Sequence, residues 1–411
     1  MSTITLHTAS WLYNPGHAPI PGGAVAVQDG RILAVGPATE LVLRFGPPAA
    51  DHPGCVLMPG FVNAHTHLEL THFPAWRLRG GLDYHPRRFV DWIIQLIKVR
   101  RGVSTAETLE SIKAGMAACL RSGTTCVGDI VSSPELLAGF VDSSLTGRCY
   151  LELIGQEPVL FESRLHSVLE AASKTSGPLL PGLSPHAPYT LASDLLPGIA
   201  TASRQHGLPL SLHLAESSDE DRFLFDSGGP LAEELYPLVG WQGFLPAPRR
   251  MTPAGFFDSG GLLGASTLAV HCVQLTPADA ALLKQRGVTI CLCPRSNERL
   301  AVGTAPVHLF RKLGIPLCIG TDSLASNDSL SMWDELRFAL DVYKGEFTPD
   351  ELLQMATSGG ASGLGLAGQT GSLEEGKRAD IQVVALEGAC TAERLLGQGR
   401  LQQVLLEGRR C

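Results

Sequence analysis

Two histidines stand two residues apart at the end of an apolar run, in the segment PGFVNAHTHLE. Side chains at positions i and i+2 of a β-strand point to the same side, so His65 and His67 could bind one metal ion together. Two surface histidines near a turn would give the same pattern, and 13 histidines in 411 residues make one such pair plausible by chance. The pair alone therefore indicates a metal site without establishing one.

Four more residues able to bind a metal follow apolar runs further along the chain. They are His186 after GLSP, His213 at the end of LPLSLH, His271 at the end of STLAVH and Asp322 after PLCIGT. A lone histidine of this kind is more often a core residue with a hydrogen-bond partner. Five apolar runs that all end in such residues are much harder to obtain by chance. The pattern therefore predicts that these side chains converge on one site.

A barrel would bring these residues together. From about residue 60 onward, short apolar segments alternate with amphipathic segments of helix length, which is typical of β-α units around a parallel sheet. The predicted strands are 60–65, 124–130, 147–154, 182–186, 210–213, 267–271, 288–293 and 316–320, and the clearest predicted helices are 89–100, 106–121, 277–286 and 332–342. Eight strands predict a (β/α)8 barrel of the TIM type, which carries its active site at the carboxyl ends of its strands.

The two ends of the chain have a different character. An Asp29-Gly30 turn separates the strand-like segments 24–27 and 32–35, and glycine-rich turns separate strand-like runs in 371–411. We expect residues 1–58 and 366–411 to form one small β-sandwich domain beside a barrel of residues 59–365. The segment 217–259, rich in glycine, proline and acidic residues, is too long for a plain connection and is expected to be an active-site insertion.

Composition excludes several classes of protein. The formal net charge is −8 and no Lys/Arg-rich run occurs, so nucleic acid is not an expected partner. We find neither a signal-peptide pattern nor an apolar run long enough to span a bilayer, so a cytoplasmic protein is expected, with no membrane partner. The 10 cysteines include no C-x-x-C pair and are interpreted as reduced core residues.

These motifs, together with several others, resemble the amidohydrolase superfamily. The similarity is to the branch that contains adenosine, methylthioadenosine/S-adenosylhomocysteine and guanine deaminases and the triazine chlorohydrolases. The matching segments are PGFVNAHTHLE, SPHAPYT, HLAE, VHCV, CPRSN, GTDS and GSLEEGKRADI. The resemblance implies that His65, His67, His213 and Asp322 bind one divalent metal, usually zinc and in some relatives iron. Three imidazoles and a carboxylate suit either ion, so the sequence does not choose between them.

Hydrolysis at such a site also needs proton transfer. A bound divalent cation lowers the pKa of a water molecule, which can then attack an electron-poor ring carbon that carries an amino group. Glu216 is the candidate that moves a proton from the water to the ring nitrogen, although it could instead be an exposed acid at a helix start. Asp322 could hold and deprotonate the water, and His271 could orient it and stabilise the developing charge.

The remaining candidates concern the substrate and the number of metals. No strand ends in a lysine that could bridge two metals, which disfavours a binuclear site. The resemblance implies that His186 contacts the substrate, the alternative being a packing histidine. We expect Glu69, Arg295, Ser296 and Asn297 to reach the substrate at the rim. Arg295 could instead form a salt bridge, and Trp76 could line the pocket or simply pack.

NAHTHLEL, FVDWI and CPRSN together resemble most closely the aminodeoxyfutalosine deaminases of menaquinone biosynthesis. Such enzymes remove the 6-amino group of an adenine whose ribosyl tail contains a benzoate, which an arginine should meet. The candidates for this role are Arg79, Arg148, Arg222 and Arg295. The alternatives are another aminoheterocycle deaminase, such as a methylthioadenosine or S-adenosylhomocysteine deaminase, a triazine-type chlorohydrolase, and an inactive barrel that serves as a scaffold. A homodimer is the default expectation for an enzyme of this size.

Overall fold

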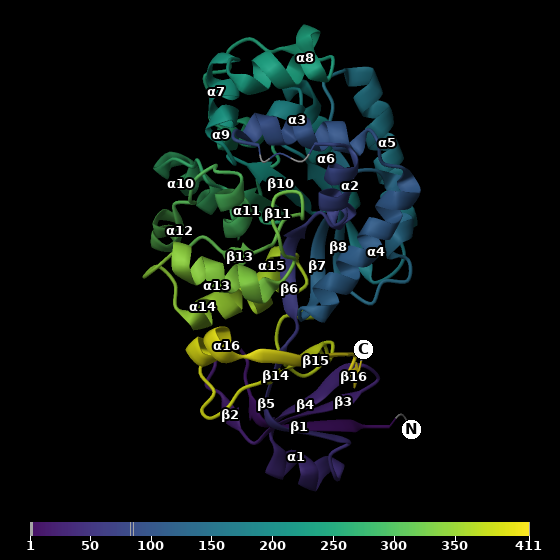
Figure 1. Ribbon diagram of the computed structural model, residues 1–411, viewed down its shortest axis with the longest axis vertical. Helices are drawn as coiled ribbons and strands as arrows, with labels where there is room; N and C mark the ends of the chain where they lie inside the picture. Colours follow the sequence, from purple (N-terminus) through teal and green to yellow (C-terminus); the bar gives the residue numbers. More distant parts are fainter. Residues whose placement is uncertain (1–2, 83, 85, 411) are drawn as a thin grey trace.

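The computed structural model describes residues 3–82, 84 and 86–410. The chain forms a large barrel and a smaller β domain, and both ends of the chain lie in the smaller domain (Figure 1). Within the described residues, no helix is both long and apolar enough to cross a membrane.

The barrel consists of eight parallel strands in sequence order, as predicted. They are β6 (Phe61–Thr66), β7 (Thr124–Val131), β8 (Thr146–Leu153), β9 (Leu179–Pro185), β10 (Leu210–Leu214), β11 (Thr267–His271), β12 (Thr289–Leu292) and β13 (Leu317–Ile319). The circle is nearly closed by an isolated bridge between Thr66 and Asp322. There the Asp322 amide donates to the His65 carbonyl at 3.0 Å. The seam between the first and last strands thus passes directly beside the predicted metal ligands.

Helices surround the barrel and include all four that the sequence predicts. The longer ones are α3 (Phe89–Arg100), α4 (Thr105–Arg121), α5 (Pro158–Lys174), α6 (Leu196–His206), α10 (Pro277–Arg286) and α13 (Met332–Val342), and the shorter ones are α2 (Phe73–Arg79), α11 (Pro294–Arg299), α12 (Val307–Leu313), α14 (Pro349–Gln354) and α15 (Gly360–Gly363). Short stretches of 3₁₀ or π helix lie at Leu68–Leu70, Pro134–Phe140, Pro188–Thr190, Ser193–Leu195 and Met355–Gly359. Helix α10 begins at a reciprocal cap between Thr276 and Asp279 and ends at Gly287, whose left-handed backbone favours glycine. Local sequence therefore sets where the chain turns back into the next strand.

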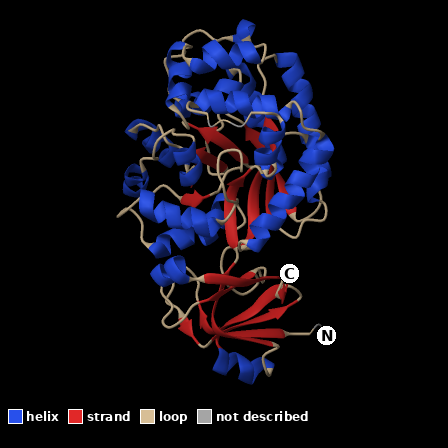
Figure 2. Cartoon of the chain, in the orientation of Figure 1, coloured by secondary structure: helices blue, strands red, loops and turns tan. Residues whose placement is uncertain are grey.

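The small domain combines both ends of the chain, as predicted. Its strands are β1 (Thr5–Leu12), β2 (Ile20–Pro21), β3 (Gly23–Gln28), β4 (Arg31–Pro37), β5 (Ala50–Pro59), β14 (Ile381–Ala385), β15 (Arg400–Leu406) and β16 (Arg409–Arg410). Hydrogen bonds join all of them into one continuous sheet, in which β5 lies between β1 and β14. The predicted hairpin turn at Asp29 and Gly30 is confirmed, and both residues have positive φ. Helix α1 (Ala38–Phe45) packs on one face of the sheet, and α16 (Ala392–Gln398) lies between the sheet and the barrel (Figure 2).

The segment 217–259 folds into short helices over the mouth of the barrel (Figure 1). They are α7 (Ser218–Asp226), a π turn at Leu231–Leu235, α8 (Tyr236–Leu238), a 3₁₀ turn at Gln242–Phe244 and α9 (Pro253–Ser259). The π turn contacts α3, so the insertion and α3 together form a wall above the strands.

The cysteines behave as the sequence predicts. All nine in the described residues are free thiols, and all except Cys55 are buried. Cys126, Cys291, Cys293 and Cys318 belong to the apolar cluster that fills the barrel interior.

Candidate metal centre and active site

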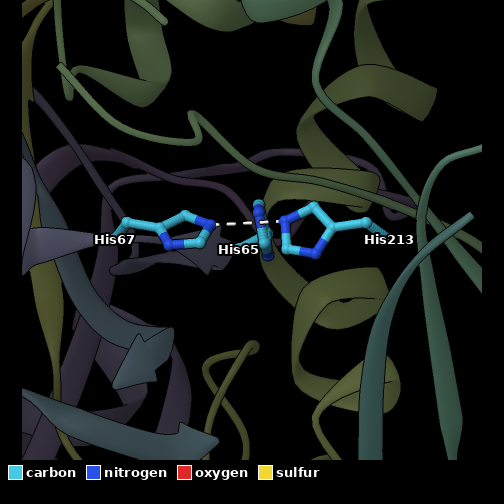
Figure 3. Close-up of side chains that lie close together, drawn as sticks. All are labelled: His65, His67 and His213. Atoms are coloured by element: carbon cyan, nitrogen blue, oxygen red, sulfur yellow. Dashed lines mark hydrogen bonds between the residues drawn. The ribbon is translucent and has the colours of Figure 1, made fainter. Parts of the chain in front are cut away.

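Three histidines converge at the carboxyl ends of β6 and β10. His67 Nε2 and His213 Nε2 lie 3.3 Å apart, and Figure 3 shows these two nitrogens directed toward each other. The ring centroid of His65 is 4.9 Å from that of His67 and 5.0 Å from that of His213. One ligand atom from each of the three residues fits within 4.8 Å of the others. His65 lies near the end of β6 and His67 directly follows the last residue of that strand, so both imidazoles reach the same place, as predicted.

Asp322, beside β6 at the seam of the barrel, and His271, on the neighbour of β10, complete the cluster. His65, His271 and Asp322 form a second group whose ligand atoms lie within 4.8 Å of one another. Asp322 Oδ1 lies 3.8 Å from His65 Nε2 and 3.7 Å from His67 Nε2. The other oxygen, Oδ2, accepts hydrogen bonds from Ser296 Oγ at 2.6 Å and Ser326 Oγ at 2.8 Å. These bonds leave Oδ1 facing the imidazoles.

The backbone at this rim takes an unusual conformation. Ala215, His271, Cys272 and Asp322 all have positive φ, between 50° and 70°. Residues with a Cβ rarely adopt this region, and such residues cluster at functional sites where the surrounding structure holds them in place. These residues lie at or shortly after the carboxyl ends of β10, β11 and β13, where the chain leaves the sheet. Two of these four residues, His271 and Asp322, are ones that the sequence predicts to be functional, and the other two are next to predicted residues or their strand ends.

Burial fixes the protonation states of the cluster. It lowers the pKa of His65, His213, His186 and His271, so these imidazoles are neutral near pH 7 and can donate a lone pair to a metal. The pKa of Asp322 is about 2, because attraction by His67, His65 and His271 and the Ser296 hydrogen bond outweigh the opposing effect of burial. The hydrogen bonds from Ser296 and Ser326 also favour the charged form of Asp322.

The donor set fits a divalent cation. Two imidazoles bound to one tetrahedral zinc ion at about 2.0–2.1 Å would have their nitrogens about 3.3–3.4 Å apart, close to the 3.3 Å between His67 and His213. Within the described residues, neither ring nitrogen of His65 has a hydrogen-bond partner, although both are buried. Buried polar atoms without a partner are costly, and a bound cation would satisfy the one that faces the cluster. The residues therefore fit the metal that the sequence predicts.

Glu216 lies beside this cluster. Its Oε1 is 3.6 Å from His271 Nε2, and the side chain is buried. Burial raises the pKa of Glu216 well above its usual value, with further contributions from Asp322 and Glu220, so the carboxyl group holds a proton more readily than an exposed acid. The alternative of an exposed acid at a helix start does not describe this residue.

A cavity of about 300 Å³ opens above the cluster. The histidines and acidic residues that line it are His67, Glu69, Glu152, His186, His213, Glu216, His271 and Asp322. Its apolar walls come from α3, with Trp92, Ile93, Leu96 and Ile97, and from the 217–259 segment, with Leu235, Val239 and Trp241. The insertion thus lines the cavity, as the sequence predicts. An apolar cavity with a few polar groups at one end is typical of a small-molecule site.

Two predicted substrate residues lie in the cavity wall. His186 is partly buried, with its ring centroid 4.8 Å from that of His213 and its Nε2 3.9 Å from Glu152 Oε1. Glu69 is almost fully buried, and its Oε2 accepts hydrogen bonds from the amide of Ser132 at 3.1 Å and from its hydroxyl at 2.8 Å. Its Oε1 lies 2.6 Å from Arg100 Nη1.

The prediction that Ser296, Asn297 and Arg295 reach the substrate needs correction. Ser296 and Asn297 are buried and do not line the cavity. Helix α11 begins immediately after β12 and turns these side chains towards the cluster, where Ser296 bonds to Asp322 and Asn297 Oδ1 lies 2.9 Å from His271 Nδ1. Arg295 forms a salt bridge with Asp328, which was the alternative expected for it.

Neither Trp76 nor the other predicted arginines line the cavity. Trp76 packs with Leu70 and Phe73 in a separate apolar cluster, so its alternative interpretation holds. Arg79 pairs with Glu107 on the outer helices. The Arg148 side chain donates to the carbonyls of Leu364 and Pro181, away from the cavity, and Arg222 lies exposed on α7.

Sequence reasoning missed Trp92, Arg100 and Trp241 in the cavity wall. Trp92 belongs to the FVDWI segment, whose resemblance to known deaminases was a usable signal. Trp241 lies within the predicted insertion, but nothing in its neighbourhood distinguishes it from a packing residue. Arg100 ends an amphipathic helix, where a basic side chain is common for reasons of helix polarity alone.

The fold and the cluster are those of a barrel enzyme with a candidate metal centre. A model of the amidohydrolase family matches residues 56–411, and a model of an imidazolonepropionase-like composite domain of bacteria matches residues 23–45. The chain belongs to the amidohydrolase family.

Individual relatives extend along most of the chain. An aminodeoxyfutalosine deaminase of Deinococcus radiodurans is 33% identical over 378 residues, which cover 88% of this chain and 85% of that protein. A 5-methylthioadenosine/S-adenosylhomocysteine deaminase of Moorella thermoacetica is 32% identical, with 90% of this chain and 83% of that protein covered. The crystal structure of an adenosine deaminase from Xanthomonas campestris with bound zinc superposes with a TM-score of 0.82 at 26% identity, covering 99% of this chain and 92% of that chain.

Proposed function

We propose that this protein is a metal-dependent hydrolytic deaminase that acts on an aminated purine nucleoside. The observation that carries the proposal is the position of Glu216 and His271 beside the buried histidine cluster, at the floor of a cavity wide enough for a heterocycle. The named relatives, all deaminases of nucleoside-type substrates, support the same reaction class. The combination of a metal site, a separate acid/base and an apolar cavity suits hydrolysis of the C–N bond that joins an amino group to a heterocyclic ring.

His65, His67, His213 and Asp322 would hold one divalent cation, with zinc as the first choice and iron as the alternative. When bound, such a cation acts as a Lewis acid and lowers the pKa of water. Glu216 takes a proton from the attacking water and delivers it to a nitrogen of the ring, a transfer for which a carboxyl group with a raised pKa is suited. The second proton of the water passes through Asp322 to the amino group, and the C–N bond then breaks to release ammonia. His271 orients the water, and Asn297 fixes the ring of His271 through their 2.9 Å hydrogen bond.

The substrate we propose is 6-amino-6-deoxyfutalosine, which would place the protein in menaquinone biosynthesis. Support comes from the relative in Deinococcus radiodurans and from the cavity, whose aromatic side chains Trp92 and Trp241 suit contact with flat rings. A second candidate is 5-methylthioadenosine or S-adenosylhomocysteine, favoured by the Moorella thermoacetica relative. His186 and Glu69 are the residues we expect to contact the substrate.

A substrate panel tests the proposal. The zinc- and iron-loaded proteins are each assayed for ammonia release from aminodeoxyfutalosine, methylthioadenosine, S-adenosylhomocysteine, adenosine and guanine. We expect deamination of at least one adenine nucleoside, with the highest kcat/KM for aminodeoxyfutalosine. A folded, metal-loaded protein that releases no ammonia from any of these compounds would contradict the deaminase assignment and favour an inactive scaffold or another leaving group.

Two variants separate the metal site from the acid/base. His65→Ala should lose bound metal and activity together, because it removes the central imidazole. Glu216→Gln keeps the shape and volume of the side chain, so it should keep metal while turnover falls by about 10²- to 10⁴-fold. Metal content by elemental analysis and steady-state kinetics measure both effects. If Glu216→Gln turned over as fast as the wild type, Glu216 would not be the acid/base.

A further inference from the structure

The cavity contains one basic side chain among several acids. Glu69, Glu152, Glu216 and Asp322 line it, and Arg100 is the only lysine or arginine that lines it within the described residues. Arg100 is the last residue of α3, the helix that also supplies the apolar wall with Trp92. A cation at the end of an apolar wall is placed to meet the far end of a ligand that lies along that wall.

Arg100 is held in place by a closed set of contacts. Its Nη1 lies 2.6 Å from Glu69 Oε1, and its Nη2 donates to Ser132 Oγ at 2.7 Å. The Ser132 hydroxyl in turn donates to Glu69 Oε2 at 2.8 Å. Since a guanidinium has five N–H groups in a rigid plane, these two contacts orient it and leave donors for a ligand. The side chain is therefore preorganised.

The two side chains of the Glu69–Arg100 ion pair differ in how much of their surface is exposed. Both side chains line the cavity, but Glu69 is 2% exposed and Arg100 is 36% exposed, so the positive member of the pair is the more accessible one. A purely structural ion pair would not need to present its guanidinium to the ligand space. Because Glu69 offsets part of the charge and acids line the rest of the cavity, this position favours a singly charged carboxylate over a doubly charged phosphate.

We propose that Arg100 is the specificity residue of this site and binds a carboxylate on the tail of the aminoheterocyclic substrate. This rests on the proposed deaminase function and narrows it to nucleosides with a singly anionic tail. Neutral nucleosides share the ring chemistry but make no charged contact with Arg100. A guanidinium and a carboxylate form strong, directional hydrogen bonds, which makes this contact suited to discrimination between them.

The test compares Arg100→Met with the wild type on aminodeoxyfutalosine, whose tail is acidic, and methylthioadenosine, whose tail is neutral. Methionine keeps an unbranched apolar stem and removes the charge. We expect kcat/KM for the acidic nucleoside to fall by about 10- to 100-fold, mostly through KM, and that for the neutral one to change by less than about threefold. Adenosine 5′-monophosphate should be a poor substrate of the wild type. Arg79→Met is the matched control, because Arg79 pairs with Glu107 outside the cavity and should change neither substrate.

Loss of Arg100 also leaves Glu69 without its cation, which could repel an acidic tail by itself. The double variant Glu69→Gln/Arg100→Met removes both charges and should remain impaired on the acidic nucleoside. The proposal would be overturned if the double variant regained the wild-type kcat/KM for the acidic nucleoside. It would also be overturned if Arg100→Met lowered kcat/KM equally for both substrates.

Binding provides a readout that does not need turnover. Calorimetric titration of the same two nucleosides into the Glu216→Gln protein, with and without Arg100→Met, should show weaker binding of the acidic one only. If the wild type turned over neither nucleoside, the deaminase function would fail, while this titration would still decide the role of Arg100. Unchanged binding of the acidic nucleoside would refute that role whatever the kinetics show.

Discussion

Replacing Ser296 with alanine should weaken metal binding without unfolding the protein. The Ser296 hydroxyl donates to Asp322 Oδ2 at 2.6 Å, and Ser326 donates to the same oxygen at 2.8 Å. These two bonds orient the carboxylate so that Oδ1 faces His65 and His67. Alanine removes one of the two donors and nothing larger than a hydroxyl. The carboxylate then gains rotational freedom that a metal must restrict again on binding.

The size of the effect follows from the charge on the acceptor. A hydrogen bond to a charged group contributes about 1.5–3 kcal/mol, and about 1.4 kcal/mol corresponds to a factor of ten in affinity. Because Ser326 still holds Oδ2, the lower part of this range applies. We therefore expect the metal dissociation constant to rise by about 10- to 30-fold in Ser296→Ala. The double variant with Ser326→Ala should lose clearly more than either single variant, since the two donors share one acceptor.

Competition with a chromophoric chelator measures the metal affinity, and thermal unfolding of the metal-loaded protein measures stability. Ser211→Ala is the matched control, because Ser211 is also buried in the barrel but its hydroxyl has no hydrogen-bond partner among the described residues. An affinity of Ser296→Ala within twofold of the wild type would refute the view that Ser296 orients a metal ligand. An equal loss of affinity in Ser211→Ala would instead indicate a general effect on the barrel.

Three further predictions concern the site and the small domain. Gly320→Ala should lose metal and about 1–3 kcal/mol of stability, because a Cβ there would lie 2.7 Å from the backbone nitrogen of His65. Gly198→Ala is the control and should be tolerated, because its Cβ would meet open space. Metal content and urea unfolding are measured for both variants. Removal of metal by a chelator should abolish activity and lower Tm by several degrees, both restored by added zinc, and an unchanged Tm would contradict a metal site in the cluster. Burial lowers the pKa of His7 in spite of its bond to the Gly408 carbonyl, so only the unfolded chain takes up a proton just below pH 6.5. The free energy of unfolding should therefore fall as pH drops below about 6.5, and less steeply in His7→Gln, as measured by urea unfolding at pH 7.5 and 5.5.

Strand ends were the most predictable part of the site. Apolar runs mark the strands, parallel strands share one carboxyl edge, and so the meeting of His65, His213, His271 and Asp322 follows from topology alone. The helices are similarly predictable, because amphipathic periodicity and caps such as that of α10 are local properties. The single sheet that joins both termini depends on pairing between β5 and β14, and no local signal specifies which strands pair.

Side-chain direction beyond the strand ends was not predictable. CPRSN was correctly placed beside the cluster, but the immediate start of α11 turns Ser296 and Asn297 inward to Asp322 and His271 instead of outward to a substrate. The role of Arg100 could not be predicted from the sequence either. Its importance comes from a salt bridge with Glu69, a partner on a different element, and a sequence contains no direct record of such a contact.

The seam between β6 and the residues after β13 also affects the order in which the chain folds during synthesis. The Asp322 amide bonds to the carbonyl of His65, so the first and the last strands of the barrel meet where the ligands meet. A chain growing on the ribosome presents its imidazoles long before its carboxylate, and it cannot assemble the complete centre until the final strand has docked. Binding of the proposed metal by the complete ligand set would then follow closure of the barrel, and a chain truncated before Asp322 would lack both the closing bridge and the carboxylate.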